Sequence, residues 1–197
     1  MMQSTFSRFA RTAVTRTSLA PSTTIFGNSR WFSSDGSLCD KLAFIGTGKM
    51  AQSMIRPLIN KGYQPLDKIA IYDVSTSAIK EMKKEFGDSL QAADSIEELV
   101  HDADMIICAV KPQNISAQFW AQFPDKMRED ATFISILAGT TLKEFRPSGV
   151  SKLVRATPNT PAQIGEGMTV WCCTPNLTVG NRESVKKLLN TFGESVS

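Results

Sequence analysis

Hydrophobic residues follow two alternating patterns from residue 38 to the end of the chain. Short apolar runs of strand length alternate with segments in which apolar residues recur every three or four positions, as on one face of a helix. The predicted strands cover residues 41–46, 68–73, 104–110, 131–139, 151–157 and 167–173, and residues 194–197 look like the start of another. The predicted helices cover residues 75–87, 94–102, 115–127 and 182–193, besides one that follows the first strand.

The helix after the first strand is predicted from apolar residues at helical spacing: Met50, Met54, Ile55, Leu58 and Ile59. Pro57 lies inside this pattern. Proline has no N–H to donate to the residue four positions earlier, so we expect a kink or an early end to the helix.

The alternation of strands and helices predicts βαβ units. Residues 104–110 are almost entirely apolar, which is typical of a strand covered on both faces. We therefore expect an α/β fold of the Rossmann type, in which a doubly wound, mostly parallel sheet carries helices on both faces.

The first predicted strand ends in a turn with small residues at its first, third and sixth positions: Gly46, Thr47, Gly48, Lys49, Met50 and Ala51. Gly46 permits a tight turn, Gly48 lets the backbone approach a diphosphate, and Ala51 lets the helix pack closely on the strand. The N–H groups of the first helical turn then face the anion, where the helix dipole favours negative charge. The sequence predicts a dinucleotide site here; the alternative is an ordinary tight turn.

The second predicted strand ends in Asp73, at about the 20-residue spacing from the glycine turn that dinucleotide-binding sequences show. An acid at this place can accept hydrogen bonds from both ribose hydroxyls of NAD and would repel the 2′-phosphate of NADP. Ser75, Thr76 and Ser77 offer hydroxyl and N–H groups that can hold such a phosphate. The sequence favours NADH and leaves NADPH open; the alternative for Asp73 is the acid of a plain turn.

Composition excludes several classes of function. The 197 residues are 42% hydrophobic and 21% charged, as in a globular protein with a sizeable core. No apolar run reaches the length of about 18 residues that a transmembrane helix needs. The net charge of +3 comes from four arginines in residues 1–34, which contain no acid. The near-neutral remainder gives no electrostatic footprint for nucleic acid.

Cysteine and histidine are too sparse for a metal site. Cys39, Cys108, Cys172 and Cys173 form no C-x-x-C pair, and His101 is the only histidine. Cys172 and Cys173 are adjacent in a predicted strand, so their side chains point to opposite faces. We expect no metal, no structural disulfide and a reducing compartment.

The N-terminal residues 1–36 are rich in Ser, Thr and Arg and have the composition of an organelle transit peptide. We expect this segment to be disordered and to direct the protein to the mitochondrion, with cleavage near residue 34. A plastid or cytoplasmic location is the alternative.

Three stretches downstream of the turn carry a resemblance to a known family. They are AVKPQ at residues 109–113, SILAG at residues 135–139 and RATPNTPAQIGEGMTVW at residues 155–171. Together with the turn they resemble pyrroline-5-carboxylate reductase, from about Lys41 to the end of the chain. PNTPAQIGEGMT is the most specific part, because the glycine turn and AVKP also occur in relatives such as β-hydroxyacid dehydrogenases.

The resemblance implies reduction of 1-pyrroline-5-carboxylate to L-proline by NADPH or NADH. A hydride passes from the nicotinamide to a protonated cyclic imine, a step that requires orientation and exclusion of water more than a dedicated base. The resemblance also implies that Ala109, Val110, Lys111 and Pro112 border the nicotinamide riboside. The alternative for Lys111 is a solvated lysine at a strand end.

Further site residues follow later predicted strands, at the edge where open parallel sheets bind ligands. Ala138 and Gly139 are small enough to leave room for a flat ring. The resemblance places Asn159 and Thr160 near the reacting carbon, and with Lys111 they are the candidate catalytic residues. The alternative for the Asn159 region is a rigid loop fixed by its prolines.

The chain departs from the family after its dinucleotide-binding part. The family continues into an all-helical C-terminal domain that forms the dimer and binds the substrate carboxylate. We therefore expect residues 38–197 to form an NAD(P)-binding domain, and a homo-oligomer only for a full-length chain. The alternatives are a non-catalytic dinucleotide-binding module and a β-hydroxyacid-type dehydrogenase.

Overall fold

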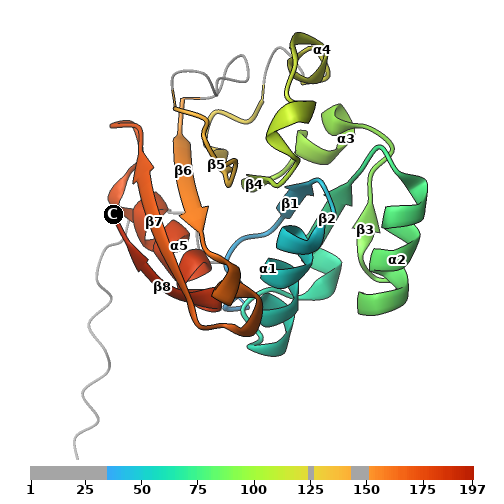
Figure 1. Cartoon of the computed structure of the whole chain (residues 1–197), viewed down its shortest axis with the longest axis horizontal. Helices are drawn as coiled ribbons and strands as arrows, with labels where there is room; N and C mark the ends of the chain where they lie inside the picture. The colour runs from blue at the N-terminus through green and yellow to red at the C-terminus, as the bar shows by residue number, and fades with distance from the viewer. Residues whose placement is uncertain (1–34, 124–126, 143–150) are drawn as a thin grey trace, which may run out of the picture.

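The computed structural model describes residues 35–123, 127–142 and 151–197 (Figure 1). The predicted transit peptide lies outside this part of the chain, except for its last two residues. Asp35, one of these two, already contacts the folded body, because its carboxylate pairs with Lys68 at 2.7 Å.

Within the described residues, eight strands form one sheet in the order β3-β2-β1-β4-β5-β6-β7-β8. Their bounds are Leu42–Ile45 (β1), Ile69–Tyr72 (β2), Gln91–Ala92 (β3), Met105–Cys108 (β4), Thr132–Ser135 (β5), Leu153–Pro158 (β6), Gly167–Cys173 (β7) and Gly193–Val196 (β8). Strands β1 to β6 are mutually parallel, and β7 pairs antiparallel with β6. The predicted Rossmann-type, mostly parallel sheet is confirmed, with one reversal that the pattern of apolar runs did not reveal.

Helices cover both faces of this sheet. Their bounds are Lys49–Asn60 (α1), Thr76–Phe86 (α2), Ile96–Val100 (α3), Ala117–Trp120 (α4) and Val179–Leu189 (α5), with short 3-10 turns at Leu66–Lys68 (η1), Pro112–Asn114 (η2), Thr160–Ile164 (η3) and Asn190–Phe192 (η4). In Figure 1, α3 and α4 lie together, away from α1 and α5. The arrangement is the doubly wound one that the sequence predicts.

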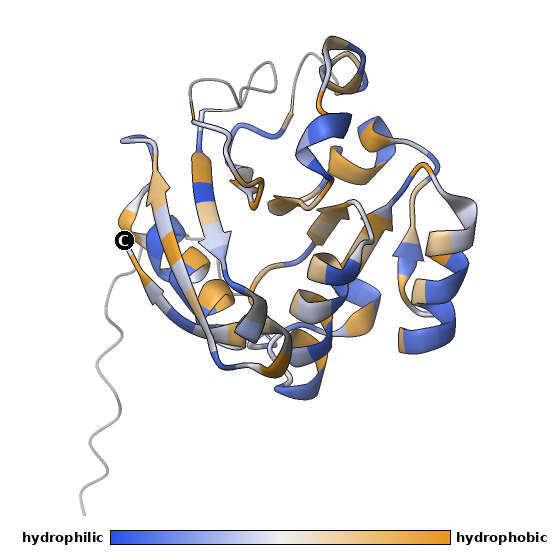
Figure 2. Ribbon diagram, in the orientation of Figure 1, coloured by the Kyte–Doolittle hydropathy of each residue, from blue (hydrophilic) through white to orange (hydrophobic). Residues whose placement is uncertain are grey.

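Adjacent residues of β1 show why both faces are covered. Phe44 belongs to one buried cluster, which also contains Met54 of α1 and Leu188 of α5. Ala43 belongs to the other, which contains Leu99 of α3 and Phe119 of α4. Because neighbouring side chains of a strand point to opposite faces, an apolar strand needs cover on both sides. Figure 2 shows the hydrophobic residues concentrated on the central strands β1 and β4.

Side-chain caps fix where several helices begin. The Ser75 hydroxyl accepts a hydrogen bond from the Ala78 N–H at the start of α2, and the Ser95 hydroxyl accepts one from the Glu98 N–H at the start of α3. Both caps agree with the predicted helix starts. Helix α2 ends at Gly87, also as predicted.

Pro57 does not end α1, which continues to Asn60. The Lys61 N–H donates to the Pro57 carbonyl at 3.0 Å, so the last turn is intact. Met54 and Leu58 are fully buried on either side of the proline. Their burial offsets the single backbone bond that proline cannot make. Of the kink or early end that we predicted, the early end is wrong, and the kink stays a prediction.

Helix α4 is shorter than the predicted helix over residues 115–127. Its apolar residues instead form an aromatic cluster in which the ring centroids of Phe119 and Phe123 lie 5.5 Å apart, and those of Phe123 and Phe133 5.8 Å apart. The aromatic residues whose spacing predicted a long helix are thus buried from one short helix and the turn that follows it. Strand β3 was not predicted, because it consists of only two residues, both exposed, and therefore has no run of apolar residues.

Candidate dinucleotide site

Gly46 joins the ends of the three strands at the centre of the sheet. Its φ is +92°, in the region that glycine adopts readily, and its N–H donates to the Tyr72 carbonyl at the end of β2 at 2.8 Å. A Cβ at this position would lie 3.0 Å from the carbonyl of Ala109 and from the N of Val110, just past β4. Glycine is therefore required here by the backbone conformation and by the close approach of β4.

Gly48, unlike Gly46, is not required to be glycine by its own backbone or by neighbouring protein atoms. It caps α1 with φ −66° and ψ 179°, and a Cβ added to it would have nothing within 4 Å. The first intrahelical bond runs from the Gln52 N–H to the Gly48 carbonyl, so the N–H groups of Lys49, Met50 and Ala51 precede it. With no capping side chain and no acid in the first turn, this helix start is suited to an anion.

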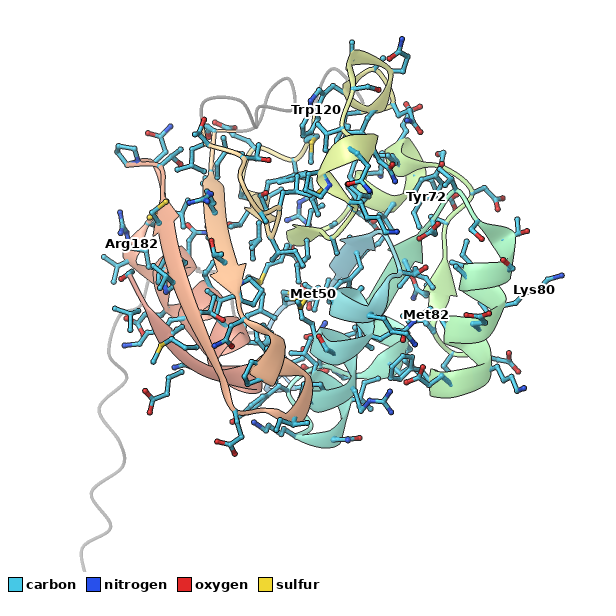
Figure 3. The ribbon with its side chains drawn as sticks, in the orientation of Figure 1. Met50, Tyr72, Lys80, Met82, Trp120 and Arg182 are labelled. Carbon is cyan, nitrogen blue, oxygen red and sulfur yellow. The ribbon has the colours of Figure 1, made fainter. Side chains whose placement is uncertain are left out.

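Side chains in the first turn of α1 split between interior and solvent. Ala51 is fully buried, which allows the close packing of helix on strand that the sequence predicts. Met50 is partly buried against the core and lies near the centre of the molecule in Figure 3. Lys49 is exposed. These positions leave the turn's backbone, rather than its side chains, facing a ligand.

Asp73 holds the turn to the corner between β2 and α2. Its Oδ2 accepts hydrogen bonds from the Thr47 N–H at 2.8 Å and from the Thr47 hydroxyl at 2.9 Å. Its Oδ1 accepts one from the Ser75 N–H at 2.9 Å. The predicted contact with ribose remains a prediction, because both carboxylate oxygens accept hydrogen bonds from the protein itself.

A cleft of about 750 Å³ opens beside this turn. Predicted residues from the ends of three strands line it: Gly46, Gly48, Asp73, Ala109, Val110 and Lys111. Thr47, Lys49, Met50, Ala51, Ser75 and Pro112 flank these residues along the chain without lining the cleft. The volume, the bare backbone at Gly48 and the uncapped helix start fit an elongated ligand that carries a diphosphate.

The far wall of the cleft comes from residues that the sequence analysis missed. They share uncharged polar side chains: Gln113, Asn114, Ser116, Gln118 and Gln122. Phe119 of α4 and Ile96 of α3 add apolar surface. Their signal was present in the sequence as a polar segment directly after the Lys-Pro break. Its role depends on α4 folding back over the strand ends, which no local pattern predicts.

Besides the flanking residues named above, four more predicted residues do not line this cleft: Ala138, Gly139, Asn159 and Thr160. Ala138 and Gly139 are exposed beyond the end of β5. The Asn159 side chain accepts a hydrogen bond from the Met168 N–H at 2.9 Å and so ties the end of β6 to β7. Thr160 begins η3. The catalytic roles of Asn159, Thr160 and Lys111 stay predictions.

Cysteine chemistry does not contribute to the cleft. Cys108, at the end of β4, is fully buried, and burial raises the pKa of its thiol to about 12. All four cysteines are free, and Cys172 is exposed while Cys173 is partly buried. In the part of the chain that the structure describes, no three His, Cys, Asp or Glu side chains gather as a metal site would require. Within the same residues, no helix is long and apolar enough to cross a membrane.

A family model described as "NADP oxidoreductase coenzyme F420-dependent" matches residues 41–139, which make up half of the chain. The chain belongs to this family. The matched residues of this NADP oxidoreductase family run from β1 through β5, so they include the Gly46 turn, Asp73 and Lys111.

Curated relatives carry a more specific name. The chain is 34% identical over 159 residues to pyrroline-5-carboxylate reductase of Escherichia coli (strain K12), an alignment that covers 79% of this chain and 57% of the relative. It is 29% identical over 155 residues to pyrroline-5-carboxylate reductase of Arabidopsis thaliana, covering 78% and 55%. The predicted resemblance is confirmed for the dinucleotide-binding region.

A solved structure agrees with these sequence relatives. The crystal structure of Plasmodium falciparum pyrroline carboxylate reductase with NADP bound matches with a TM-score of 0.69 and 25% identity, covering 82% of this chain and 58% of that one. The chain therefore spans little more than half the length of the relatives that it matches.

Proposed function

We propose that this chain binds NADP(H) in the cleft beyond β1, β2 and β4, and that it is the dinucleotide-binding part of a pyrroline-5-carboxylate reductase. The observation that carries the proposal is the turn at Gly46 and Gly48. One glycine brings three strand ends together, and the other leaves bare backbone at an uncapped helix start. The 34% identity to the Escherichia coli reductase supports the substrate assignment.

Different residues of the cleft would bind different parts of the cofactor. The N–H groups at the start of α1 would hold the diphosphate, where the helix dipole favours negative charge. Lys111, exposed at the cleft wall, supplies a positive charge that would draw the anionic cofactor towards it. When bound, the cofactor supplies the hydride that reduces the protonated imine carbon of 1-pyrroline-5-carboxylate.

We propose that this chain prefers NADPH to NADH. The Plasmodium falciparum protein that this chain resembles was solved with NADP bound. In this chain, the Ser75 hydroxyl lies 2.9 Å from the Ser77 hydroxyl at the start of α2, so a 2′-phosphate there would meet a pair of neighbouring hydroxyl groups. Asn159 and Thr160 remain the candidates for contact with the substrate, from the end of β6.

Titration and turnover together test this function. The purified chain should quench or shift NADPH fluorescence with saturable binding, and a chain extended from the genomic locus should oxidise NADPH in the presence of 1-pyrroline-5-carboxylate. Lys111→Gln should weaken NADPH binding by about threefold, and Lys84→Gln, on the exposed part of α2, serves as the charge-matched control. Absence of saturable NADPH or NADH binding would refute the assignment.

Cellular location and assembly are part of the same proposal. The Arg-, Ser- and Thr-rich composition of residues 1–36 supports import into the mitochondrion. Fusing these residues to a fluorescent protein should send it there, and replacing Arg8, Arg11 and Arg16 by Gln should leave it in the cytoplasm. We further propose that a homo-oligomer forms only from a longer chain, which light scattering on both lengths can test.

A further inference from the structure

Three residues from separate elements form one hydrogen-bonded unit, which we call the Asp73 clamp: Thr47, Asp73 and Ser75. Thr47 lies between the two glycines of the turn, Asp73 follows β2, and Ser75 caps α2. Two donors of Thr47 and one of Ser75 converge on the carboxylate of Asp73, at 2.8, 2.9 and 2.9 Å. The clamp therefore joins the turn after β1 to the corner after β2.

Burial makes the clamp a fixed connection. Thr47 is only 1% exposed, so its hydroxyl depends on Asp73 for a partner. Hydrogen bonds to an ionised acceptor are shorter and stronger than neutral ones. Among the described residues, no lysine or arginine forms an ion pair with Asp73, and Lys80 of the nearby helix extends away into solvent (Figure 3). Backbone and hydroxyl donors alone satisfy the carboxylate.

The remaining capacity of the carboxylate is too small for recognition of a ribose diol. A carboxylate offers about four acceptor sites, and three hydrogen bonds of the clamp use most of them. Two free sites would be needed to accept both ribose hydroxyls of NADH. The Oδ2 atom, which already accepts twice, has none left.

We infer that Asp73 is a positioning residue, which holds the diphosphate-binding turn in place and does not select between NADH and NADPH. This inference rests on the proposed function, because the turn is taken to bind a dinucleotide. Selection at the ribose then falls to the start of α2. The charge of Asp73 serves the turn rather than the cofactor's sugar.

Substitutions that preserve shape test the clamp. Asp73→Asn keeps one acceptor but replaces the other oxygen with an NH₂ group, so the three donors of Thr47 and Ser75 cannot all be satisfied. The affinities for NADPH and NADH, measured by fluorescence titration of the full chain, should both fall by about tenfold and their ratio should stay within about threefold. Thr47→Val should weaken both in the same way but less, and Thr47→Ser should bind like the unaltered chain.

Two controls distinguish loss of the clamp from a general effect of removing a charge and from two independent losses of affinity. Asp88→Asn removes the same charge from an exposed turn after α2 and should change neither affinity. The double variant Asp73→Asn with Thr47→Val should bind no worse than Asp73→Asn alone, because the two changes break the same bonds. A gain in NADPH affinity alongside a loss in NADH affinity in Asp73→Asn would overturn the inference.

A readout without cofactor keeps the clamp testable if the proposed function fails. In Asp73→Asn, the Thr47 and Ser75 amides should exchange with solvent at least about tenfold faster, while the amides of β1 and β4 keep their protection. Unchanged exchange at both amides would overturn the clamp. A chain that binds neither nucleotide yet shows this exchange pattern would refute the proposed function alone.

Discussion

Residues of one type can have opposite requirements at neighbouring positions, as Gly46 and Gly48 do. Gly46 has a positive φ, and a Cβ there would crowd the backbone of Ala109 at 3.0 Å, whereas Gly48 has an ordinary φ and no atom within 4 Å of an added Cβ. The first stabilises the fold itself, and the second is needed only when something lies against the turn.

Substituting each glycine should separate these two requirements. Gly46→Ala should lower the free energy of unfolding by about 2 kcal/mol, from backbone strain and crowding against Ala109. Gly48→Val should change it by no more than about 0.5 kcal/mol, because a Cβ added there meets no protein atom within 4 Å. It should nevertheless weaken NADPH binding by roughly a hundredfold, since the valine occupies the space of the diphosphate.

Urea denaturation and fluorescence titration measure the two effects independently. Gly48→Ala, with a smaller side chain at the same place, is the matched control and should give an intermediate loss of affinity. Equal affinity in Gly48→Val and the unaltered chain would mean that the diphosphate does not lie at this helix start.

Cysteine reactivity should follow burial. The pKa of the Cys108 thiol is raised to about 12 by burial, and burial also raises that of Cys39, so at pH 8 both remain protonated as well as inaccessible. Iodoacetamide should modify Cys172, which is exposed, in the folded chain and reach the two buried thiols only in denaturant. Peptide mass spectrometry gives the order, and Cys172→Ser should abolish the early modification.

At the scale of elements, α1 and its proline show where packing outweighs local propensity. The spacing of apolar residues predicts the helix correctly, but of the kink or early end that the rule for proline predicts, the early end does not occur. The rule concerns one backbone bond, whereas Met54, Ile55 and Leu58 together bury a complete helical face. Sequence alone could not weigh the two, because the depth of burial depends on β1 and α5.

Replacing Pro57 should show how much the proline destabilises α1. Pro57→Ala restores an N–H donor to the helix, which stabilises the folded state, but it also frees the unfolded chain from the restriction that proline imposes. The net result should be a free energy of unfolding that is higher by about 1–2 kcal/mol. Urea denaturation measures it, with Asn60→Ala at the exposed end of the same helix as the control. A lower free energy of unfolding would show that α1 packs better with the proline than without it.

The strand ends were the most predictable part of the candidate site. Gly46, Asp73 and Lys111 each follow a strong apolar run, and the parallel order brings them to one edge of the sheet. The polar far wall of the cleft, which follows Lys111 in the sequence, was not predictable. Its position depends on the short helix α4 and on aromatic packing between residues far apart in the sequence. Likewise, the antiparallel turn of β7 onto β6 leaves no mark in an apolar run, which looks the same in either direction.

At the scale of the whole molecule, the sheet is covered unevenly. On β7, Trp171 is buried towards α5 while Val170 is 62% exposed on the other side. Val170 pairs in register with Val196 of β8, which is 56% exposed, and Met168 precedes them on the same face at 42%. These residues form an apolar surface at one end of the sheet.

This surface should make the chain bind hydrophobic dyes. Fluorescence of anilinonaphthalene sulfonate should rise on addition of the chain, and the pair Val170→Thr with Val196→Thr should reduce the rise by about half or more, because both replacements add a hydroxyl and keep the β-branched shape. Val179→Thr, at the start of α5, is the control: Val179 is 78% exposed, more than Val170 or Val196, and its replacement should leave the signal unchanged. Equal dye binding by all three proteins would contradict the assignment of the surface.

The contrast within the glycine turn bears on how this chain can evolve. A descendant that keeps the three central strands loses stability if it replaces Gly46, whatever it binds, because the positive φ strains any larger residue and its Cβ would lie 3.0 Å from Ala109. Gly48 is under no such obligation and can drift once selection for a nucleotide is relaxed. A lineage in which position 48 varies while position 46 does not has kept its scaffold and abandoned its ligand.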